Sequence, residues 1–293
     1  MGDTALTRSV GSDRRYRSDW VALVLGAGLS LLPLLAVAAT RPLIDAHLHY
    51  TGVDAAALPP EQIIALFDGN GIDAALVSGQ PPWAVEALYR AAPDRILPFL
   101  SPYRGQADKA RWMHDPGLPA RVSKALESGI YRGIGEIHIF ADDRESPVLA
   151  ALVALAAERD LMLQVHGDAA VIETIFAQAP NVTVLWAHLG TDPRPQVLAP
   201  LLARYPRLFV DTSVRDERFV DSDGKLWRQW RRFFIAHQAQ VLVGVDTFWT
   251  PRWNRFSEVA AGIRGWLDQL PPQVADRLAY ENAARLFGLD GSE

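Results

Sequence analysis

Six side chains in this sequence are of the types that hold a catalytic metal ion. Two are histidines spaced two residues apart at the end of an apolar run, three end later apolar runs, and one lies inside such a run. The six are His47, His49, Glu136, His166, His188 and Asp246. Imidazole and carboxylate groups are ligands that Zn²⁺ and similar ions accept, often with one position left open for water. The set therefore indicates metal-dependent chemistry.

The chain contains no cysteine, so histidine and carboxylate must hold any metal, and thiol catalysis and disulfide frameworks are excluded. Side chains alternate across a strand, so His47 and His49 project to the same side. Asp45 shares that side, and we interpret it either as a partner that orients a ligand or as a buried structural residue. Asp211, in the run FVDTS, is interpreted as structural.

Three further histidines have other interpretations. His114 and His237 have the pattern of solvated residues in a loop or at a helix end. His138 lies two residues after Glu136 and shares its face. It is a candidate substrate contact, a hydrogen-bonding partner of a ligand, or a packing residue.

These residues must be positioned by a repeated strand and helix unit. Eight short apolar runs alternate with amphipathic stretches, which is typical of parallel βα units, and residues 40–293 match the roughly 250 residues of a (β/α)8 TIM barrel. An open doubly wound sheet would give similar local patterns. The predicted strands are residues 43–48, 73–78, 96–101, 133–139, 161–166, 182–188, 208–212 and 241–246. The predicted helices include residues 60–70, 83–91, 118–128, 147–159, 195–205, 257–270 and 274–287.

Residues 1–39 have the pattern of a signal peptide. A polar stretch with Arg14, Arg15 and Arg17 precedes residues 21–39, which carry no charge and end in small residues. We therefore expect export to the periplasm, with residues 40–293 as the mature domain, or a membrane anchor if the segment is not cleaved. The pair Arg14-Arg15 is compatible with twin-arginine export, but residues 16–18 fit that motif poorly, so a Sec route is equally open.

The charge balance bears on partners. The chain has 29 Lys and Arg against 34 Asp and Glu, and the domain that follows residue 39 is acidic as well. Nucleic acid binding requires a basic surface, so nucleic acid is not favoured as a partner. We expect a small-molecule substrate, the export machinery and, as an open possibility, a second copy of the chain.

The ordered set of candidate ligands resembles that of the amidohydrolase superfamily, and particular strings resemble its amidohydrolase family 2 branch. These are IDAHLHY at Ile44, GIGEIHIF at Gly133, LQVHGD at Leu163, LWAHLG at Leu185, VGVDTFWTPRW at Val243 and ENAARLFGL at Glu281. The resemblance implies a metal-dependent (β/α)8 barrel. It implies His47, His49, His166 and Asp246 as ligands of one divalent ion, expected to be Zn, with Mn and Mg as alternatives.

The resemblance leaves the number of ions open. It implies that His188 is either a ligand of a second ion or a hydrogen-bonding electrophile. Some branches place a carboxylated lysine at the position of Glu136. In TatD-like nucleases, a glutamate at this position accompanies two metal ions. The decarboxylase branch works with one metal ion.

The expected reaction is hydrolysis of a small ester, lactone or amide, because a bound divalent ion lowers the pKa of water toward ~7 and polarises a carbonyl. Asp246 would accept the proton of the water and return it to the leaving group, and His188 would hold the developing oxyanion. Both are therefore predicted to be catalytic.

The predicted substrate contacts are Tyr50, Arg104, His138, Trp249 and Arg252, with Arg215 as a further candidate. The polar stretch 215–230 is interpreted as a lid or an oligomer contact.

Three other functions remain open at this stage. A metal-dependent non-oxidative decarboxylase of an unsaturated or aromatic acid would use the same barrel but consume no water. A TatD-like nuclease would share most ligands and need a basic approach surface. A binding protein could keep the metal for stability alone, because fold does not determine function.

Overall fold

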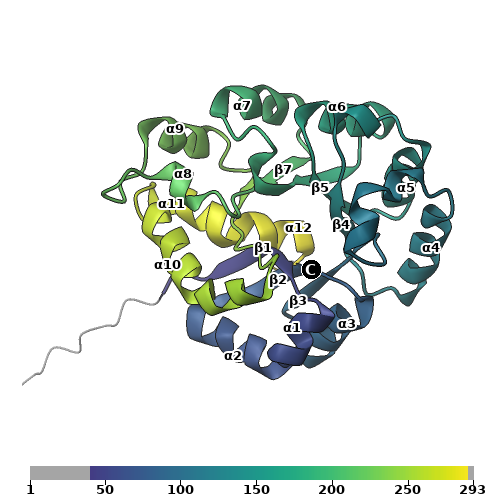
Figure 1. Ribbon diagram of the computed structural model, residues 1–293. Helices are drawn as coiled ribbons and strands as arrows, with labels where there is room; N and C mark the ends of the chain where they lie inside the picture. Colours follow the sequence, from purple (N-terminus) through teal and green to yellow (C-terminus); the bar gives the residue numbers. More distant parts are fainter. Residues whose placement is uncertain (1–39, 290–293) are drawn as a thin grey trace, which may run out of the picture. The chain divides into compact units, whose positions relative to one another are not determined.

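The computed structural model describes residues 40–289. Within them, eight parallel strands form one sheet in the order β1 to β8, with helices between the strands (Figure 1). The strands are β1 (Leu43–His49), β2 (Ile72–Ser78), β3 (Ile96–Leu100), β4 (Gly133–His138), β5 (Met162–His166), β6 (Thr183–Trp186), β7 (Leu208–Asp211) and β8 (Val241–Leu242). The predicted (β/α)8 barrel is confirmed. The predicted signal peptide, residues 1–39, lies outside the described residues.

The barrel is closed by backbone hydrogen bonds between β1 and the residues that follow β8. The amide of Ala46 donates to the carbonyl of Val243 at 2.8 Å, and the amide of Asp246 donates to the carbonyl of His47 at 2.7 Å. These bonds bring the eighth segment of the chain beside the first. Asp246 is therefore a neighbour of His47 even though the two residues are far apart in the sequence.

Helices cover the outside of the sheet (Figure 1). They are α1 (Gly52–Ala57), α2 (Pro60–Asn70), α3 (Pro82–Ala91), α4 (Leu118–Ala125), α5 (Pro147–Glu158), α6 (Ala169–Gln178), α7 (Pro195–Arg204), α8 (Asp216–Phe219), α9 (Arg228–Ala236), α10 (Phe256–Leu267), α11 (Pro272–Asp276) and α12 (Asn282–Phe287). Several begin with proline, whose missing N–H needs no partner in the first turn. Ser146 and Asp168 cap α5 and α6 by accepting backbone N–H groups.

The apolar residues form two clusters that leave one end of the barrel for chemistry. The larger lies between the sheet and the helices. The smaller fills the barrel interior and includes Ile44, Phe99 and Leu185 together with Ala283 of α12. Phe287 of α12 meets the ring of Phe99 edge to face at 6.3 Å. Because α12 covers this end, the polar inward side chains are left at the other end, where the strands finish.

Two strands end two or more residues earlier than predicted. The prediction placed residues 182–188 and 241–246 in strands, but β6 stops at Trp186 and β8 at Leu242. His188 and Asp246 have φ of 59° and 57°, a left-handed conformation that no strand contains. The predicted helix 274–287 is likewise divided, since a π-helical turn at Arg277–Glu281 separates α11 from α12.

The polar stretch 215–230 is attached to the barrel's own helices. It contains α8, an antiparallel bridge between Val220 and Leu226, and the start of α9. Phe219 is fully buried, and its ring lies 4.9 Å from that of Trp230 and 5.3 Å from that of Trp266. Across residues 40–289, no helix has both the length and the apolar character needed to cross a bilayer.

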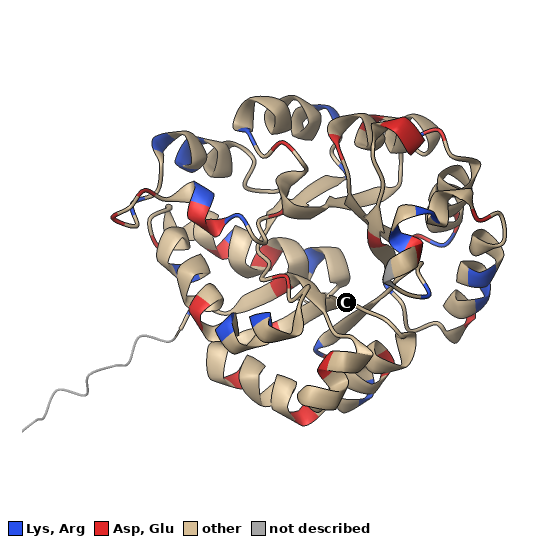
Figure 2. Ribbon diagram, viewed as in Figure 1, with Lys and Arg blue, Asp and Glu red and all other residues tan. Residues whose placement is uncertain are grey.

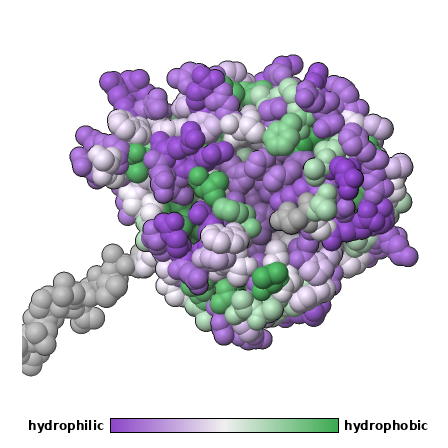
Figure 3. All heavy atoms as spheres, in the orientation of Figure 1, coloured by the Kyte–Doolittle hydropathy of each residue, from purple (hydrophilic) through white to green (hydrophobic). Residues whose placement is uncertain are grey.

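The surface of the described domain is mixed in charge and hydropathy. Lys and Arg are interspersed with Asp and Glu on the face in Figure 2, and Figure 3 shows small hydrophobic patches among hydrophilic residues on the same face. The large hydrophobic side chains exposed within residues 40–289 are Val53, Trp83, Phe140, Trp227, Phe248 and Trp249.

Candidate metal centre

Three of the predicted ligands converge closely where β1 and β8 end. The Nε2 atoms of His47 and His49 lie 3.3 Å apart. Oδ1 of Asp246 lies 3.9 Å from the first and 3.5 Å from the second. Two atoms that each bind one zinc ion at about 2 Å stand roughly 3 to 4 Å from each other. His47, His49 and Asp246 therefore have the spacing of ligands around one cation.

Glu136 of β4 connects this group to three other histidines. Its Oε1 lies 2.9 Å from Nδ1 of His166 and 3.1 Å from Nε2 of His188, and its Oε2 lies 2.8 Å from Nε2 of His138. Burial alone would raise the pKa of Glu136, but the hydrogen bonds to the imidazoles outweigh it and hold that pKa well below its usual value. Glu136 is therefore an anionic centre of the site.

His166 does not join the group that the resemblance implied. It clusters with Glu136 and His138, whereas the group around Asp246 consists of His47 and His49. The register explains this, because His138 and His166 are direct partners across β4 and β5, and their rings stack with centroids 4.3 Å apart.

The histidines are oriented through their second ring nitrogen. Nδ1 of His47 lies 3.1 Å from Oδ2 of Asp211, and Nδ1 of His188 lies 2.8 Å from Oγ of Ser213. Nδ1 of His49 lies 3.0 Å from Oγ of Ser78. For His47 and His49, a partner at Nδ1 sets the ring orientation and leaves Nε2 for a metal. All three rings therefore turn Nε2 toward Glu136 and Asp246.

Two residues of the site adopt a backbone conformation that side chains rarely take, and each is held by an arginine. His188 and Asp246 both have positive φ, which typically costs ~1–3 kcal/mol per residue and persists where the surroundings enforce it. Nε of Arg252 donates to the carbonyl of Asp246 at 2.6 Å. Nε of Arg215 donates to the carbonyl of His188 at 3.0 Å.

The electrostatics of these residues favour a bound cation. Burial would lower the pKa of His47, but the charges of Asp211 and Asp246 overcome this and raise that pKa to about 10. Within residues 40–289, Oδ1 of Asp246 is a buried carboxylate oxygen without a hydrogen-bond partner. An anionic atom of this kind is costly unless a positive charge compensates it. Because this atom faces two imidazole nitrogens, the donor set fits a divalent metal ion.

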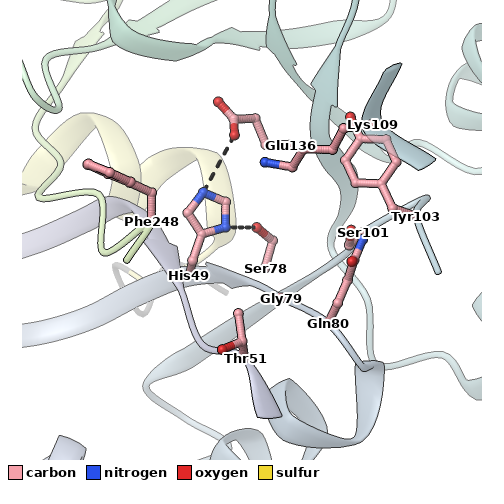
Figure 4. A pocket seen from close by; sticks show the side chains of 10 residues that line it. All are labelled: His49, Thr51, Ser78, Gly79, Gln80, Ser101, Tyr103, Lys109, Glu136 and Phe248. Atoms are coloured by element: carbon pink, nitrogen blue, oxygen red, sulfur yellow. Dashed lines mark hydrogen bonds and ion pairs between the residues drawn. The ribbon is translucent and has the colours of Figure 1, made fainter. Parts of the chain in front are cut away.

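A recess opens beside these residues (Figure 4). His49 and Glu136 form its inner wall, and Phe248 lies on the opposite side of His49 from Lys109 and Tyr103 (Figure 4). The remaining lining comes from the end of β2 and from the loops after β1, β2 and β3, and it is mostly polar: Thr51, Ser78, Gly79, Gln80 and Ser101. The recess can hold a small substrate next to the candidate ligands.

Most of the predicted substrate contacts lie away from this recess. Tyr50 is fully buried, and its hydroxyl donates to the carbonyl of Leu58. The side chain of Arg104 is 68% exposed and pairs with Asp108. Trp249 is 64% exposed and does not line the recess.

Arg252 and His138 have roles that differ from simple substrate contact. Arg252 donates to the carbonyls of Val245 and Asp246, so its guanidinium holds the backbone. Arg215 does the same for His188. His138 is close to the site, where it contacts Glu136 and the Nζ atom of Lys109 at 3.2 Å.

The sequence interpretation missed the partners of the histidines. Asp211 was interpreted as structural, yet its carboxylate contacts His47 and, through Oδ1, accepts from the backbone amide of His188 at 3.1 Å. Its position at the end of a strand, as for the histidines, was a usable signal. Asp45 links β1 to the segment that follows β8, since its Oδ1 accepts from the amides of His47 and Val245. Burial raises the pKa of Asp45 to about 7.

The structure resembles two solved barrels. One is a probable 2-pyrone-4,6-dicarboxylic acid hydrolase from Acinetobacter baumannii with citric acid bound, at 14% identity and a TM-score of 0.58, covering 84% of this chain and 99% of that one. The other is the TatD homologue YjjV from Escherichia coli, at 17% identity and a TM-score of 0.59, covering 85% of this chain and 98% of that one. At these identities the likeness shows the fold.

No protein of curated function matches the chain. The family model described as amidohydrolase matches residues 41–289, which is nearly the whole described domain and includes all six candidate ligands. The barrel, the position of the ligands at the strand ends and this match agree with one another. The chain belongs to the amidohydrolase family and is a metal-dependent hydrolase of that superfamily.

Proposed function

We propose that the protein uses a divalent metal ion, zinc in the first instance, to hydrolyse a small ester, lactone or amide. The observation that carries the proposal is the convergence of His47, His49 and Asp246, with Oδ1 of Asp246 buried and unpartnered within residues 40–289. A divalent ion held there would make water a stronger acid and polarise a carbonyl group of the substrate.

The residues of the chain divide the remaining work. His47, His49 and one oxygen of Asp246 hold the ion. The second oxygen of Asp246, 3.8 Å from Nε2 of His188, takes the proton of the attacking water and returns it to the leaving group. Nε2 of His188 donates to the oxyanion that forms on the substrate carbonyl. Glu136 keeps His138, His166 and His188 in place through its two oxygens.

Lactones are the first substrates to test. The solved barrel from Acinetobacter baumannii is described as a probable hydrolase of a pyrone dicarboxylic acid, and this supports a cyclic ester as a substrate class. The small recess supports a compact substrate.

The test uses the purified domain, residues 40–293, loaded separately with Zn²⁺, Mn²⁺ or Mg²⁺. Metal content is measured by elemental analysis, and hydrolysis is followed with panels of lactones, esters and amides. Asp246→Asn is expected to lower kcat by about 100-fold or more while retaining much of the metal. Asp73→Asn, the same change at an exposed position, is the matched control. Equal rates for Asp246→Asn and the wild type would refute the proposal.

The same preparation distinguishes the alternatives. Aromatic and unsaturated acids are included, and release of CO₂ without consumption of water would indicate a decarboxylase. A nucleic acid substrate is included because YjjV shares the fold. Metal binding that raises the melting temperature, with no turnover on any panel, would indicate a binding protein.

We also propose that the protein is exported. The uncharged stretch 21–39, which follows Arg14, Arg15 and Arg17, supports a signal peptide. Cell fractionation of the full-length chain is expected to place it in the periplasm, and N-terminal sequencing is expected to show a start near Thr40. A full-length protein in the membrane fraction would indicate an anchor, and a full-length protein in the cytoplasm would refute export.

A further inference from the structure

The recess contains one basic side chain that the proposed mechanism does not use. Lys109 lies in a 3₁₀ turn, Gln106–Ala110, after β3. Its ammonium group points into the space beside Glu136 and His49 (Figure 4). Nζ contacts Nε2 of His138 at 3.2 Å. Within residues 40–289, no carboxylate lies within ion-pair distance of Nζ of Lys109. By contrast, several arginines on the surface form ion pairs with carboxylates.

Lys109 is held in position by the segment that carries it. The hydroxyl of Tyr103 accepts from the backbone amide of His138 at 2.5 Å, and Nε1 of Trp112 donates to the backbone carbonyl of the same residue at 2.8 Å. Tyr103 and Trp112 are both buried. The segment is therefore fastened to the end of β4 on both sides of Lys109, which makes the ammonium a positioned group of the recess.

A structural role in neutralising Glu136 does not account for this arrangement. Glu136 already receives hydrogen bonds from His138, His166 and His188. The contact of Lys109 is with Nε2 of His138 rather than with a carboxylate oxygen of Glu136. The ammonium keeps donors free for an anion.

The neighbouring groups suit a carboxylate held next to an apolar group. Nε2 of Gln80 donates to Oγ of Ser101 at 2.8 Å, which leaves the hydroxyl proton of Ser101 free to donate into the recess. On the other side of His49, Phe248 is an exposed aromatic residue that lines the recess. A substrate with one anionic end and one apolar part would contact Lys109 and Phe248 together.

We propose that Lys109 binds a carboxylate of the substrate, so that the enzyme acts on small anionic lactones and esters. This inference rests on the proposed hydrolase function and specifies its substrate class. The carboxylate would lie close to the reacting carbonyl, because Lys109 is joined to Glu136 through a single residue, His138.

The main test compares two substrates that differ only in charge. These are a γ-butyrolactone that carries one ring carboxylate and the same lactone with a carboxamide in its place. The wild-type enzyme is expected to prefer the carboxylate by about tenfold or more in kcat/KM, the size of a hydrogen bond to a charged group. Lys109→Met is expected to abolish this preference, and Lys109→Arg to restore most of it. Lys225→Met, the same change at an exposed lysine, is expected to keep it.

A binding measurement separates this inference from the proposed function. Calorimetry with glutarate on the zinc-loaded protein is expected to give a Kd about tenfold higher for Lys109→Met than for the wild type and for Lys225→Met. If neither lactone is turned over, the proposed substrates are rejected. If glutarate binding is nevertheless weaker in Lys109→Met than in the wild type, the anion site is supported. A preference for the carboxylate lactone that persists in Lys109→Met would overturn the inference, as would unchanged glutarate binding.

Discussion

Oδ2 of Asp211 lies 3.1 Å from Nδ1 of His47, and both side chains are completely buried. This contact points Nε2 of His47 toward His49 and Asp246. Oδ1 of the same carboxylate accepts from the backbone amide of His188. One buried aspartate at the end of β7 therefore orients two residues of the candidate metal centre, His47 in β1 and His188 just after β6.

Asp211→Asn is expected to lower zinc affinity by about 10- to 100-fold, the usual effect of losing a partner that orients a metal-binding histidine. The amide removes the negative charge that favours the N–H on Nδ1 of His47. Competition with a chromophoric chelator measures the affinity, and circular dichroism verifies folding. Asp73→Asn serves as the control, and an Asp211→Asn protein that binds zinc as tightly as the wild type would show that Asp211 has no part in orienting the ligands.

Metal removal is expected to destabilise the domain. Without a cation, Glu136 and Asp246 face each other across the histidines, and an ion bound only by the folded state adds about 2.7 kcal/mol at 100 times its Kd. Thermal unfolding in zinc is therefore expected at a higher temperature than in chelator. His49→Gln is expected to reduce this difference strongly. A melting temperature indifferent to both zinc and chelator would argue against the metal centre.

Arg252→Met is expected to weaken both stability and metal affinity. It leaves the carbonyls of Val245 and Asp246 without their guanidinium donors, at a cost of about 1–3 kcal/mol, and it releases a residue whose φ is 57°. Urea unfolding and zinc titration measure the two effects. Arg255→Met removes an exposed arginine that pairs with Glu258 and is expected to change little. If the two variants behave alike, the arginine at 252 does not hold Asp246 in place.

Asp216→Asn is expected to stabilise the domain at neutral pH. Burial raises the pKa of Asp216 to about 6, against the opposing hydrogen bond from Trp266. The folded chain therefore retains this proton where the unfolded chain has lost it, and wild-type stability falls as pH rises from about 4 to 6. Asparagine removes this penalty, which is at most about 3 kcal/mol, and can still accept from Nε1 of Trp266. Urea unfolding at pH 4 and pH 7 is expected to show a difference between the proteins only at pH 7, and equal stability there would contradict the prediction.

The strands and several helices were predictable because their patterns are local. β1 begins at Leu43 and α2 spans Pro60–Asn70, as predicted. Period-two alternation places His47 and His49 on one side of β1, and the fold brings their Nε2 atoms together. The same rule placed Glu136 and His138 together on β4, and they are in contact.

The loop residues were not predictable in the same way. Arg104, Arg215 and Arg252 were all candidates for binding a substrate, yet one pairs on the surface and two hold backbone carbonyls. A side chain outside a strand or helix has no period that sets its direction, so composition identifies the guanidinium but not its partner.

The sequence by itself determined the barrel and the set of metal-binding side chains, because strand periodicity and residue chemistry are written along the chain. Only the tertiary structure decided how they are grouped: His166 with Glu136 and His138, and Asp246 with His47 and His49. It also decided which residues support them, since Asp211 meets His47 across 164 positions and Lys109 reaches the recess through a turn anchored on β4. Contacts of this kind depend on strand register and barrel closure, which are properties of the whole chain.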